Sequence, residues 1–497
     1  MPHVDATHDL EALVQSRHPI VTIDTVEEER VDNLLQSVAS TLHMPLFTWT
    51  VTHGLQRVGG DGPVYGTANP QILVRHLATL TVRGIFHLKG LQAHLADATV
   101  VRGLRDTAQA FLRSGSTAVL SGDSIHLPGE LSREAVPFVL RLPNHDELQE
   151  VVHQILRSLK RQHDFAVNLG PDGMESLVQA LSGLTLNQAR QAVAWAVLDD
   201  DALTAQDIPR VLRRKCEAVR DEGLLEFYPP EDNTFELGGF DRLKAWLERA
   251  RVGFTSEARA LGLPAPRGIL IVGVQGCGKS LAAKAIARAW KQPLLKLDAG
   301  RLYDKFIGES EKNLRKALGF AEAIAPSILW IDEIEKGFAH GGEADGGLSQ
   351  RILGSFLTWL QERQSPVFVA ATANDVLALP PELLRKGRFD EIFFVDLPRA
   401  AEREAIFRIH LALRRQDPAG FDLAALTSAS DGFSGAEIEQ AITSGLYRAL
   451  HVRQALTTAM LREEMRGTQP LSVSRREDVE RLRDMARGRF VAVLVGS

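Results

Sequence analysis

The amino-acid sequence predicts an α/β protein built on a parallel sheet flanked by helices, with a helical subdomain after it and a second α/β domain before it. Two observations predict this fold. The apolar run 268–272 leads into GVQGCGKS and then into the helix-like LAAKAIARAW, and two later apolar runs, 327–331 and 366–372, each end near polar residues. Strands that alternate with helices form parallel sheets, and ligands bind at the carboxyl ends of their strands.

Length and composition limit the class of protein. The 497 residues exceed what one hydrophobic core usually organises, so we expect several domains. Mean hydropathy is -0.08, and no apolar run is long enough to span a membrane. The net charge of -6 supplies no overall basic field, so nucleic acid is not the expected partner. Two cysteines are too few for a disulfide framework, which indicates a reducing compartment such as the cytoplasm.

The segment GVQGCGKS is typical of a phosphate-binding loop. Glycines at 273, 276 and 278 let backbone N–H groups turn toward phosphate oxygens, and the following helix adds partial positive charge. Lys279 is expected to reach the outer phosphates and Ser280 to bind Mg²⁺ through its hydroxyl. A glycine-rich turn without a ligand is the alternative, but it would not explain the Lys-Ser ending. Cys277 within the loop is interpreted as a small residue, with a redox switch as the alternative.

Polar residues follow the two later apolar runs. Asp332 and Glu333 close the run 327–331, and Asn374 follows the run 366–372. At the carboxyl edge of a sheet, Asp332 is placed to hold Mg²⁺, and Glu333 to orient the water that attacks the γ-phosphate. Asn374 could position the same water. An acidic pair in a solvated loop is the alternative.

The segment RKGR contributes Arg385 and Arg388, three residues apart, which flank a glycine that frees the backbone. Structural salt bridges at a basic turn are one interpretation. Arginine also stabilises charge on a transferring phosphoryl group, and an arginine supplied by a neighbouring subunit makes hydrolysis depend on assembly.

The ordered motifs between about residues 234 and 450 resemble those of the AAA ATPases of the AAA+ superfamily. The series begins with FELGGFDRLK, runs through GVQGCGKS, DKFIGESEKNLR, the acidic pair and the arginine pair, and ends with the lid motif DGFSGAEIEQAI. The resemblance implies a P-loop AAA+ module with an α-helical lid that binds ATP and Mg²⁺, hydrolyses ATP and forms a homo-oligomeric, commonly hexameric, ring. The nucleotide contacts that follow are Gly238, Gly273, Val274, Gln275, Gly276, Cys277, Gly278, Lys279, Ser280, Leu281, Gly435 and Ala436.

In this family the segment DKFIGESEKNLR holds a pore loop, here Lys305, Phe306, Ile307 and Gly308. The aromatic residue of such a loop lines the axial channel and grips an extended polypeptide. Lysine and glycine beside Phe306 suit an exposed loop. The alternative is that Phe306 packs against a neighbouring subunit.

The amino-terminal half shows a faint internal repeat of the carboxyl-terminal half. FVLRLPNHDELQEVVHQIL at 138–156 parallels FFVDLPRAAEREAIFRIHL at 393–411. Yet the apolar run 19–25 leads into VEEER where glycines and a lysine would be needed, and three carboxylates repel phosphate. We therefore expect a degenerate, nucleotide-free AAA-like domain that serves assembly or partner recognition, with an unrelated α/β domain as the alternative.

The expected domains are a degenerate α/β domain at 1–157, a helical lid-like subdomain and linker at 158–225, an ATPase large subdomain at 226–400, and a helical lid with carboxyl-terminal helices at 401–497. GLLEFYPPED, ILWIDEIEKGF and QPLSVSRREDVERLRDMA extend the resemblance to one subgroup, the AAA proteins encoded by a hypothetical open reading frame in red-lineage plastids. The pore position in that subgroup often lacks an aromatic residue, whereas this chain has Phe306. A plastid-encoded member would reside in the stroma.

The expected function is Mg-ATP hydrolysis that drives remodelling or threading of a macromolecule, most simply a protein, by a ring. The alternative is a nucleotide-dependent scaffold whose amino-terminal domain binds a partner without threading. A nucleic-acid motor is a third, weaker interpretation. The mixed charges at 475–489 indicate helices that face solvent or a neighbouring subunit, with partner docking as the alternative.

Overall fold

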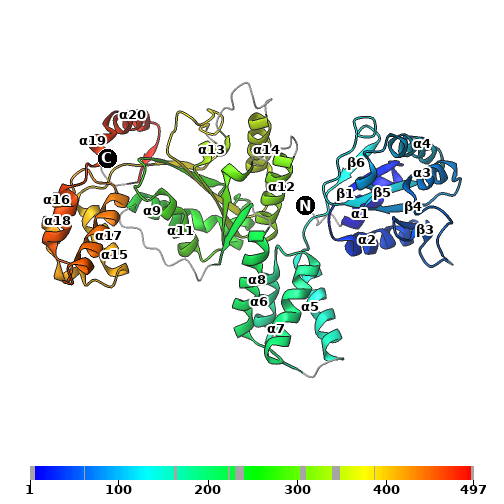
Figure 1. Cartoon of the computed structure of the whole chain (residues 1–497), viewed down its shortest axis with the longest axis horizontal. Coiled ribbons are helices and arrows are strands. Elements are labelled where there is room, and N and C mark those ends of the chain that lie inside the picture. Colours follow the sequence, from blue (N-terminus) through cyan, green and yellow to red (C-terminus); the bar gives the residue numbers. More distant parts are fainter. Residues whose placement is uncertain are drawn as a thin grey trace. The chain divides into compact units, whose positions relative to one another are not determined.

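The computed structural model describes the chain except for residues 1–5, 61, 162–164, 222–223, 230–239, 303–308, 339–347, 386 and 494–497. The chain folds into two compact units (Figure 1). The first unit contains residues 1–162 and 184–194, and the second contains residues 163–183 and 195–497.

The first unit is built on a six-stranded sheet with the order β3-β2-β4-β5-β1-β6. All neighbouring strands are parallel except the β2–β3 hairpin. The strands are β1 (Ile20–Asp24), β2 (Leu46–Thr50), β3 (Gly54–Arg57), β4 (Ile85–Lys89), β5 (Thr117–Gly122) and β6 (Ala135–Phe138).

Helices cover both faces of this sheet. The four helices are α1 (Ala6–Gln15), α2 (Glu28–Thr41), α3 (Pro70–Thr79) and α4 (Ala98–Ser114). Side chains of α1 and α2 pack on one face around Val21, Ile23 and Val119. Side chains of α3 and α4 pack on the other around Phe86 and Leu120. The alternation of buried side chains along each strand thus supplies two apolar faces, as a doubly covered parallel sheet requires.

A group of helices follows the first sheet. These are α5 (His145–Lys160), α6 (Pro171–Leu181), α7 (Leu186–Asp200) and α8 (Ile208–Asp221), with the short paired strands β7 (Ala166–Val167) and β8 (Ala202–Leu203). An asparagine–glutamate capping box starts α5, and Thr185 exchanges two hydrogen bonds with Gln188 at the start of α7.

The second unit is built on a seven-stranded sheet with the order β15-β14-β10-β13-β12-β11-β9. The strands are β9 (Leu225–Tyr228), β10 (Gly268–Gly273), β11 (Leu294–Asp298), β12 (Ser327–Asp332), β13 (Val367–Ala373), β14 (Glu391–Val395) and β15 (Val491–Ala492). Only the edge pair β9–β11 is antiparallel. The expected strands at 268–272, 327–331 and 366–372 are confirmed as β10, β12 and β13, which are neighbours in the order β10-β13-β12.

Helices flank this second sheet and continue into a helical lid. Around the sheet lie α9 (Asp241–Arg251), α10 (Ser256–Ala260), α11 (Lys279–Trp290), α12 (Glu309–Ala323), α13 (Ile334–Phe338) and α14 (Leu348–Glu362). The lid consists of α15 (Ala400–Leu413), α16 (Leu423–Ala429), α17 (Gly435–His451) and α18 (Thr458–Arg466), with its own core around Phe407, Phe433 and Ile442. Two carboxyl-terminal helices follow, α19 (Leu471–Ser474) and α20 (Arg476–Ala486).

The two sheets place their strands in the same order. The sequence β14-β10-β13-β12-β11 of the second sheet matches β6-β1-β5-β4-β2 of the first, and each sheet adds one antiparallel strand at the same edge. The second sheet is extended beyond this pattern by β15, which pairs in parallel with β14. Sequence patterns indicated helices at the carboxyl-terminal end and missed this strand.

Lys215 on α8 gives a test of the second unit's packing. Its side chain is 2% exposed, and its Nζ lies 4.8 Å from the centre of the Phe227 ring on β9. Burial lowers the pKa of Lys215 from 10.5 to about 7. Between pH 7 and 10.5, Lys215 is protonated in the unfolded chain but largely neutral in the folded protein. The unfolded state therefore binds more protons, and Lys215 makes the stability of the protein rise with pH over this range.

We expect Lys215→Met to stabilise the protein by about 1–3 kcal/mol at pH 6.5, because it removes the cost of a buried charge. The gain should shrink as the pH rises toward 9. Chemical denaturation of both proteins at several pH values measures it, with the exposed Lys316→Met as control. A variant less stable than wild type at pH 6.5 would contradict this expectation.

Candidate functional site

The phosphate loop, residues 273–280, connects β10 to the start of α11, as the sequence predicts. Glycine is required at its first position, because Gly273 has φ +143° and an added Cβ would lie 2.0 Å from the carbonyl oxygen of Val395. Gly276 and Gly278 have left-handed φ values of +75° and +88°. Residue type and backbone conformation therefore agree at the three glycines of the loop.

Lys279 is the first residue of α11 and is buried within the loop. Its Nζ donates hydrogen bonds to the carbonyl oxygens of Gly273 at 2.9 Å and Val274 at 2.8 Å. Burial lowers the pKa of Lys279 to about 8, although Cys277 and the nearby carboxylates act in the opposite direction. The ammonium group of Lys279 is thus bound by backbone carbonyl groups of the loop, and its pKa lies below that of an exposed lysine.

Asp332 joins the phosphate loop to two strands. Its Oδ1 accepts hydrogen bonds from the hydroxyl of Ser280 at 2.9 Å and from the hydroxyl of Thr372 at 2.6 Å. Ser280 is on α11, Asp332 ends β12, and Thr372 is near the end of β13. The sequence predicted the proximity of Ser280 and Asp332 but not the part played by Thr372.

Glu333 adopts a backbone conformation that is unusual for its residue type. Its φ is +49°, and its N–H donates to the hydroxyl of Thr372 at 3.0 Å. Its carboxylate accepts a hydrogen bond of 2.8 Å from Nδ2 of Asn374 and forms an ion pair with Lys336. Strained backbone conformations of this kind concentrate at functional sites. In this conformation the Glu333 carboxylate contacts the side-chain amide of Asn374, which the sequence predicted to lie nearby.

Glu335 is a further residue that the sequence patterns did not indicate. Its Oε1 accepts a hydrogen bond of 3.0 Å from the backbone N–H of Asn374. Burial raises the pKa of Glu335, and the charge of Glu333 adds to that effect. Glu335 therefore anchors the turn after β13 that presents the Asn374 side chain.

The start of the lid helix α17 contacts the phosphate loop directly. The N–H of Ala436 donates to the carbonyl oxygen of Gly276 at 3.0 Å. A small pocket, partly open to solvent, lies at this contact. It is lined by Phe240, Cys277, Val395, Asp396, Pro398, Glu402, Ile406, Gly435 and Val493. Burial raises the pKa of Cys277 to about 12, which favours a small-residue role for it over a reactive thiolate.

The predicted arginines lie elsewhere on the second unit. Gly387 between them has φ +91°. Arg388 donates to the carbonyl oxygen of Leu357 at 3.4 Å, and Arg385 is exposed. Within the described part of the chain, neither arginine forms a hydrogen bond or ion pair with Lys279 or the acidic pair. The remaining predicted residues, Gly238 and the pore-loop residues 305–308, lie outside the described residues.

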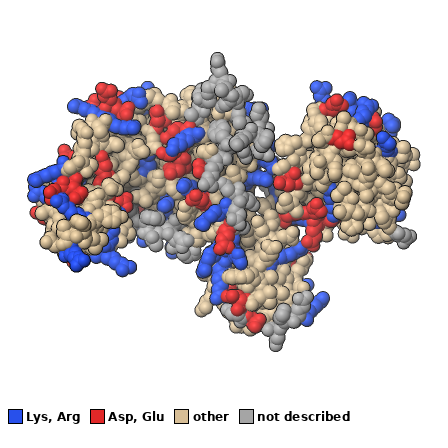
Figure 2. All heavy atoms as spheres, in the orientation of Figure 1, with Lys and Arg blue, Asp and Glu red and all other residues tan. Residues whose placement is uncertain are grey.

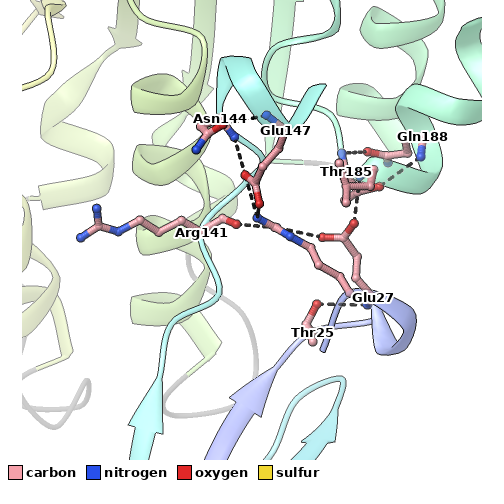
Figure 3. Close-up of polar contacts among 9 residues, drawn as sticks. Thr25, Glu27, Arg141, Asn144, Glu147, Thr185 and Gln188 are labelled. Atoms are coloured by element: carbon pink, nitrogen blue, oxygen red, sulfur yellow. Dashed lines mark hydrogen bonds and ion pairs between the residues drawn. The ribbon is translucent and has the colours of Figure 1, made fainter. Parts of the chain in front are cut away.

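The corresponding position in the first unit, between β1 and α2, is built differently. Glu27 precedes α2 and is 6% exposed, and its Oε1 accepts a hydrogen bond of 2.9 Å from the backbone N–H of Leu186 at the start of α7 (Figure 3). Arg30 donates to the carbonyl oxygen of Arg141 at 2.6 Å and to both carboxylate oxygens of Glu147 on α5. A carboxylate and a guanidinium thus connect the starts of three helices.

The surface gives few clues to a partner. On the face drawn in Figure 2, basic and acidic side chains are interspersed rather than gathered into one basic stripe. None of the helices in the described ranges combines the length and apolar character needed to cross a membrane.

Fold and site together define a P-loop ATPase of the α/β class. Residues 269–397 match the family of ATPases associated with various cellular activities (AAA). Residues 6–140 match the N-terminal domain of SpoVK-like AAA ATPases, and residues 146–222 match their second domain.

Relatives extend the match over nearly the full chain. The AAA domain-containing protein ycf46 of Guillardia theta is 36% identical over 96% of this chain and 94% of its own length. The ycf46 protein of Pyropia yezoensis is 35% identical over 97% of both chains. The cell division cycle protein 48 homolog of Archaeoglobus fulgidus is 29% identical over 72% of this chain and 51% of its own. The chain therefore belongs to the AAA ATPase family, in its ycf46-like subgroup, and it is an ATPase.

The pKa of Lys279 gives a test of the phosphate loop. The protonated form of Lys279 binds phosphate best. In the nucleotide-free protein, Lys279 loses its proton above about pH 8. We expect ADP affinity to fall between pH 7.5 and 9.5, by up to about tenfold per pH unit above the pKa. Calorimetry in buffers of different ionisation enthalpy should detect proton uptake on binding near pH 8.5. Affinity that does not change with pH, without proton uptake, would contradict this expectation.

Proposed function

We propose that this ATPase couples Mg²⁺-dependent ATP hydrolysis to mechanical work on a protein substrate, as a homo-oligomeric and most simply hexameric ring. The observation that carries the proposal is the convergence of Ser280, Asp332, Glu333 and Asn374 at the carboxyl edge of the sheet, beside the phosphate loop. Binding, metal and water-activating groups are then supplied by neighbouring elements of one rigid sheet.

The residues present fit Mg-ATP. Backbone N–H groups of the loop and Lys279 would bind the phosphates, and the oxygens of Ser280 and Asp332 are hard ligands of the kind that Mg²⁺ prefers. When bound, Mg²⁺ neutralises charge on the phosphate oxygens. The cavity against Ile406 and Gly435 would receive the base end of the nucleotide, since apolar side chains form much of its wall.

Glu333 would orient the attacking water, and Asn374 would hold the Glu333 carboxylate while sensing the γ-phosphate. Arg385 and Arg388 would act on the site of a neighbouring subunit, a role that the exposure of Arg385 permits. Phe306 and its neighbours would line the ring's axial channel. We place the protein in the cytoplasm, or in the stroma if it is plastid-encoded.

For the first unit we propose a nucleotide-free AAA-like domain. Two observations support it: its strands follow the order of the ATPase sheet, and Glu27 holds a buried carboxylate where a phosphate loop would need positive charge. The second candidate function is a scaffold in which ATP fixes the assembly state and the amino-terminal domain, which would need no nucleotide of its own, binds a partner.

Glu333→Gln tests the hydrolytic role. The amide keeps the side-chain size but is a poor base, so ATP turnover should fall by about 10²–10⁴-fold while ADP and ATP affinity stay within about threefold of wild type. Phosphate release and equilibrium binding measure the two quantities, with the exposed Glu362→Gln as control. Turnover that survives the substitution would remove Glu333 from the catalytic role.

Phe306→Ala separates the motor from the scaffold. If the ring threads polypeptide, an unfolded protein should stimulate ATPase activity of wild type but not of the variant, and both should form assemblies of equal mass. Stimulated turnover is compared by phosphate release, and mass by light scattering. If both proteins hydrolyse ATP alike and ignore polypeptide, the scaffold replaces the motor.

A further inference from the structure

The carboxyl-terminal segment, residues 471–493, returns from the lid to the edge of the ATPase sheet. It ends in β15, which pairs in parallel with β14. The N–H of Val493 donates to the carbonyl oxygen of Phe394 at 3.1 Å, and the carbonyl oxygen of Val493 accepts from the N–H of Arg242 at 3.1 Å. The end of the segment is therefore fixed between β14 and the start of α9.

A few apolar side chains anchor this segment to the ATPase core. Val479 and Val493 are 3% and 2% exposed and belong to the same core as Ile271 of β10 and Val274 of the phosphate loop. Leu471 and Val491 pack against that core. Val493 also lines the pocket beside the phosphate loop, together with Cys277 and Gly435. A residue near the end of the chain is thus part of the wall of the nucleotide cavity.

An ion pair fixes the same wall. Arg483 on α20 binds Asp396, a second lining residue, through three contacts: Nε to Oδ2 at 2.8 Å, Nε to Oδ1 at 3.1 Å and Nη2 to Oδ1 at 3.0 Å. Such two-pronged guanidinium–carboxylate pairs set orientation as well as distance. Asp396 directly follows β14, so Arg483 also holds α20 against the end of that strand.

The other end of the segment is tied to the lid. The N–H of Leu471 donates to Oε1 of Glu437 at 2.8 Å. Glu437 caps α17 together with Ser434, and α17 begins beside the phosphate loop. The segment therefore spans from the lid to the sheet edge, with both attachments close to the cavity.

We infer that the carboxyl-terminal segment is part of the nucleotide site: Val493 contacts the base end of a bound adenine nucleotide, and Arg483 is a positioning residue that holds this wall in place. The inference rests on the assignment of the cavity under the proposed function. Val493 and Arg483 lie apart from Glu333 and Asn374 in the contacts described, so they set affinity for the nucleotide and not the rate of hydrolysis. Their loss raises the KM for ATP at a constant kcat.

Three variants of the full-length chain test the inference. Val493→Ala keeps both backbone hydrogen bonds of residue 493 and removes two methyl groups that pack in the core and line the pocket. Arg483→Ala removes the ion pair with Asp396. Arg481→Ala, an exposed arginine two residues away on the same helix, is the matched control. The measurements are the Kd for ADP, the KM and kcat for ATP, and hydrogen exchange of the 491–493 amides with and without ADP.

We expect Val493→Ala and Arg483→Ala each to raise the Kd and KM by about three- to tenfold, with kcat within about twofold and Arg481→Ala like wild type. ADP should slow amide exchange at 491–493 in wild type by more than it slows exchange at core amides of the same sheet remote from the pocket, whereas a purely structural role predicts equal slowing. If Arg483→Ala fails to fold, the Kd and KM of Val493→Ala still test the inference.

Unchanged Kd and KM in Val493→Ala, or amide exchange at 491–493 that ADP slows no more than at the remote core amides, would overturn the inference. A wild type that binds no ADP would overturn the nucleotide-site assignment as well. A wild type that binds ADP, with variants that match it, leaves that assignment intact and refutes only the inference.

Discussion

The catalytic half of the protein depends on two hydrogen bonds to one carboxylate oxygen, Oδ1 of Asp332. The hydroxyls of Ser280 and Thr372 both donate to it, so the helix after the phosphate loop and two adjacent strands are held in one register. Thr372 in turn accepts the N–H of Glu333 and supports its left-handed backbone conformation. The position of the proposed water-activating carboxylate therefore follows from that of Asp332, because Thr372 is shared between the two.

Each half of the chain has its own sheet, and at the corresponding edge of each sheet the positive charge of helix starts is balanced in a different way. Helix starts carry partial positive charge and favour an anion. In the second unit, glycines and Lys279 leave room for a phosphate to fill that role. In the first unit, Glu27 accepts the N–H at the start of α7, and Arg30 binds Glu147 at the start of α5. We interpret Glu27 as a built-in anion that makes a nucleotide unnecessary there.

Sequence patterns predicted the ATPase module well because its chemistry is encoded in short segments. The phosphate loop, Asp332, Glu333 and Asn374 each follow an apolar run that marks a strand, and parallel strands bring such endings together. The patterns could not reveal Thr372, Lys336 or Val493, because a threonine within an apolar run or a valine near the chain's end carries no local signal. The partners of Glu27 are likewise up to 159 residues away in the chain, where only the fold brings them close.

The central claim is that each chain binds one nucleotide. The site lies in the second unit, and the corresponding position of the first unit binds none. Equilibrium binding of ADP to the full-length chain, counted per polypeptide, tests it most directly. We expect one ADP per chain in wild type and none in Lys279→Ala, since that lysine belongs to the single site. Two ADP per chain in wild type, or one that remains in Lys279→Ala, would show that the first unit binds nucleotide and would contradict the claim.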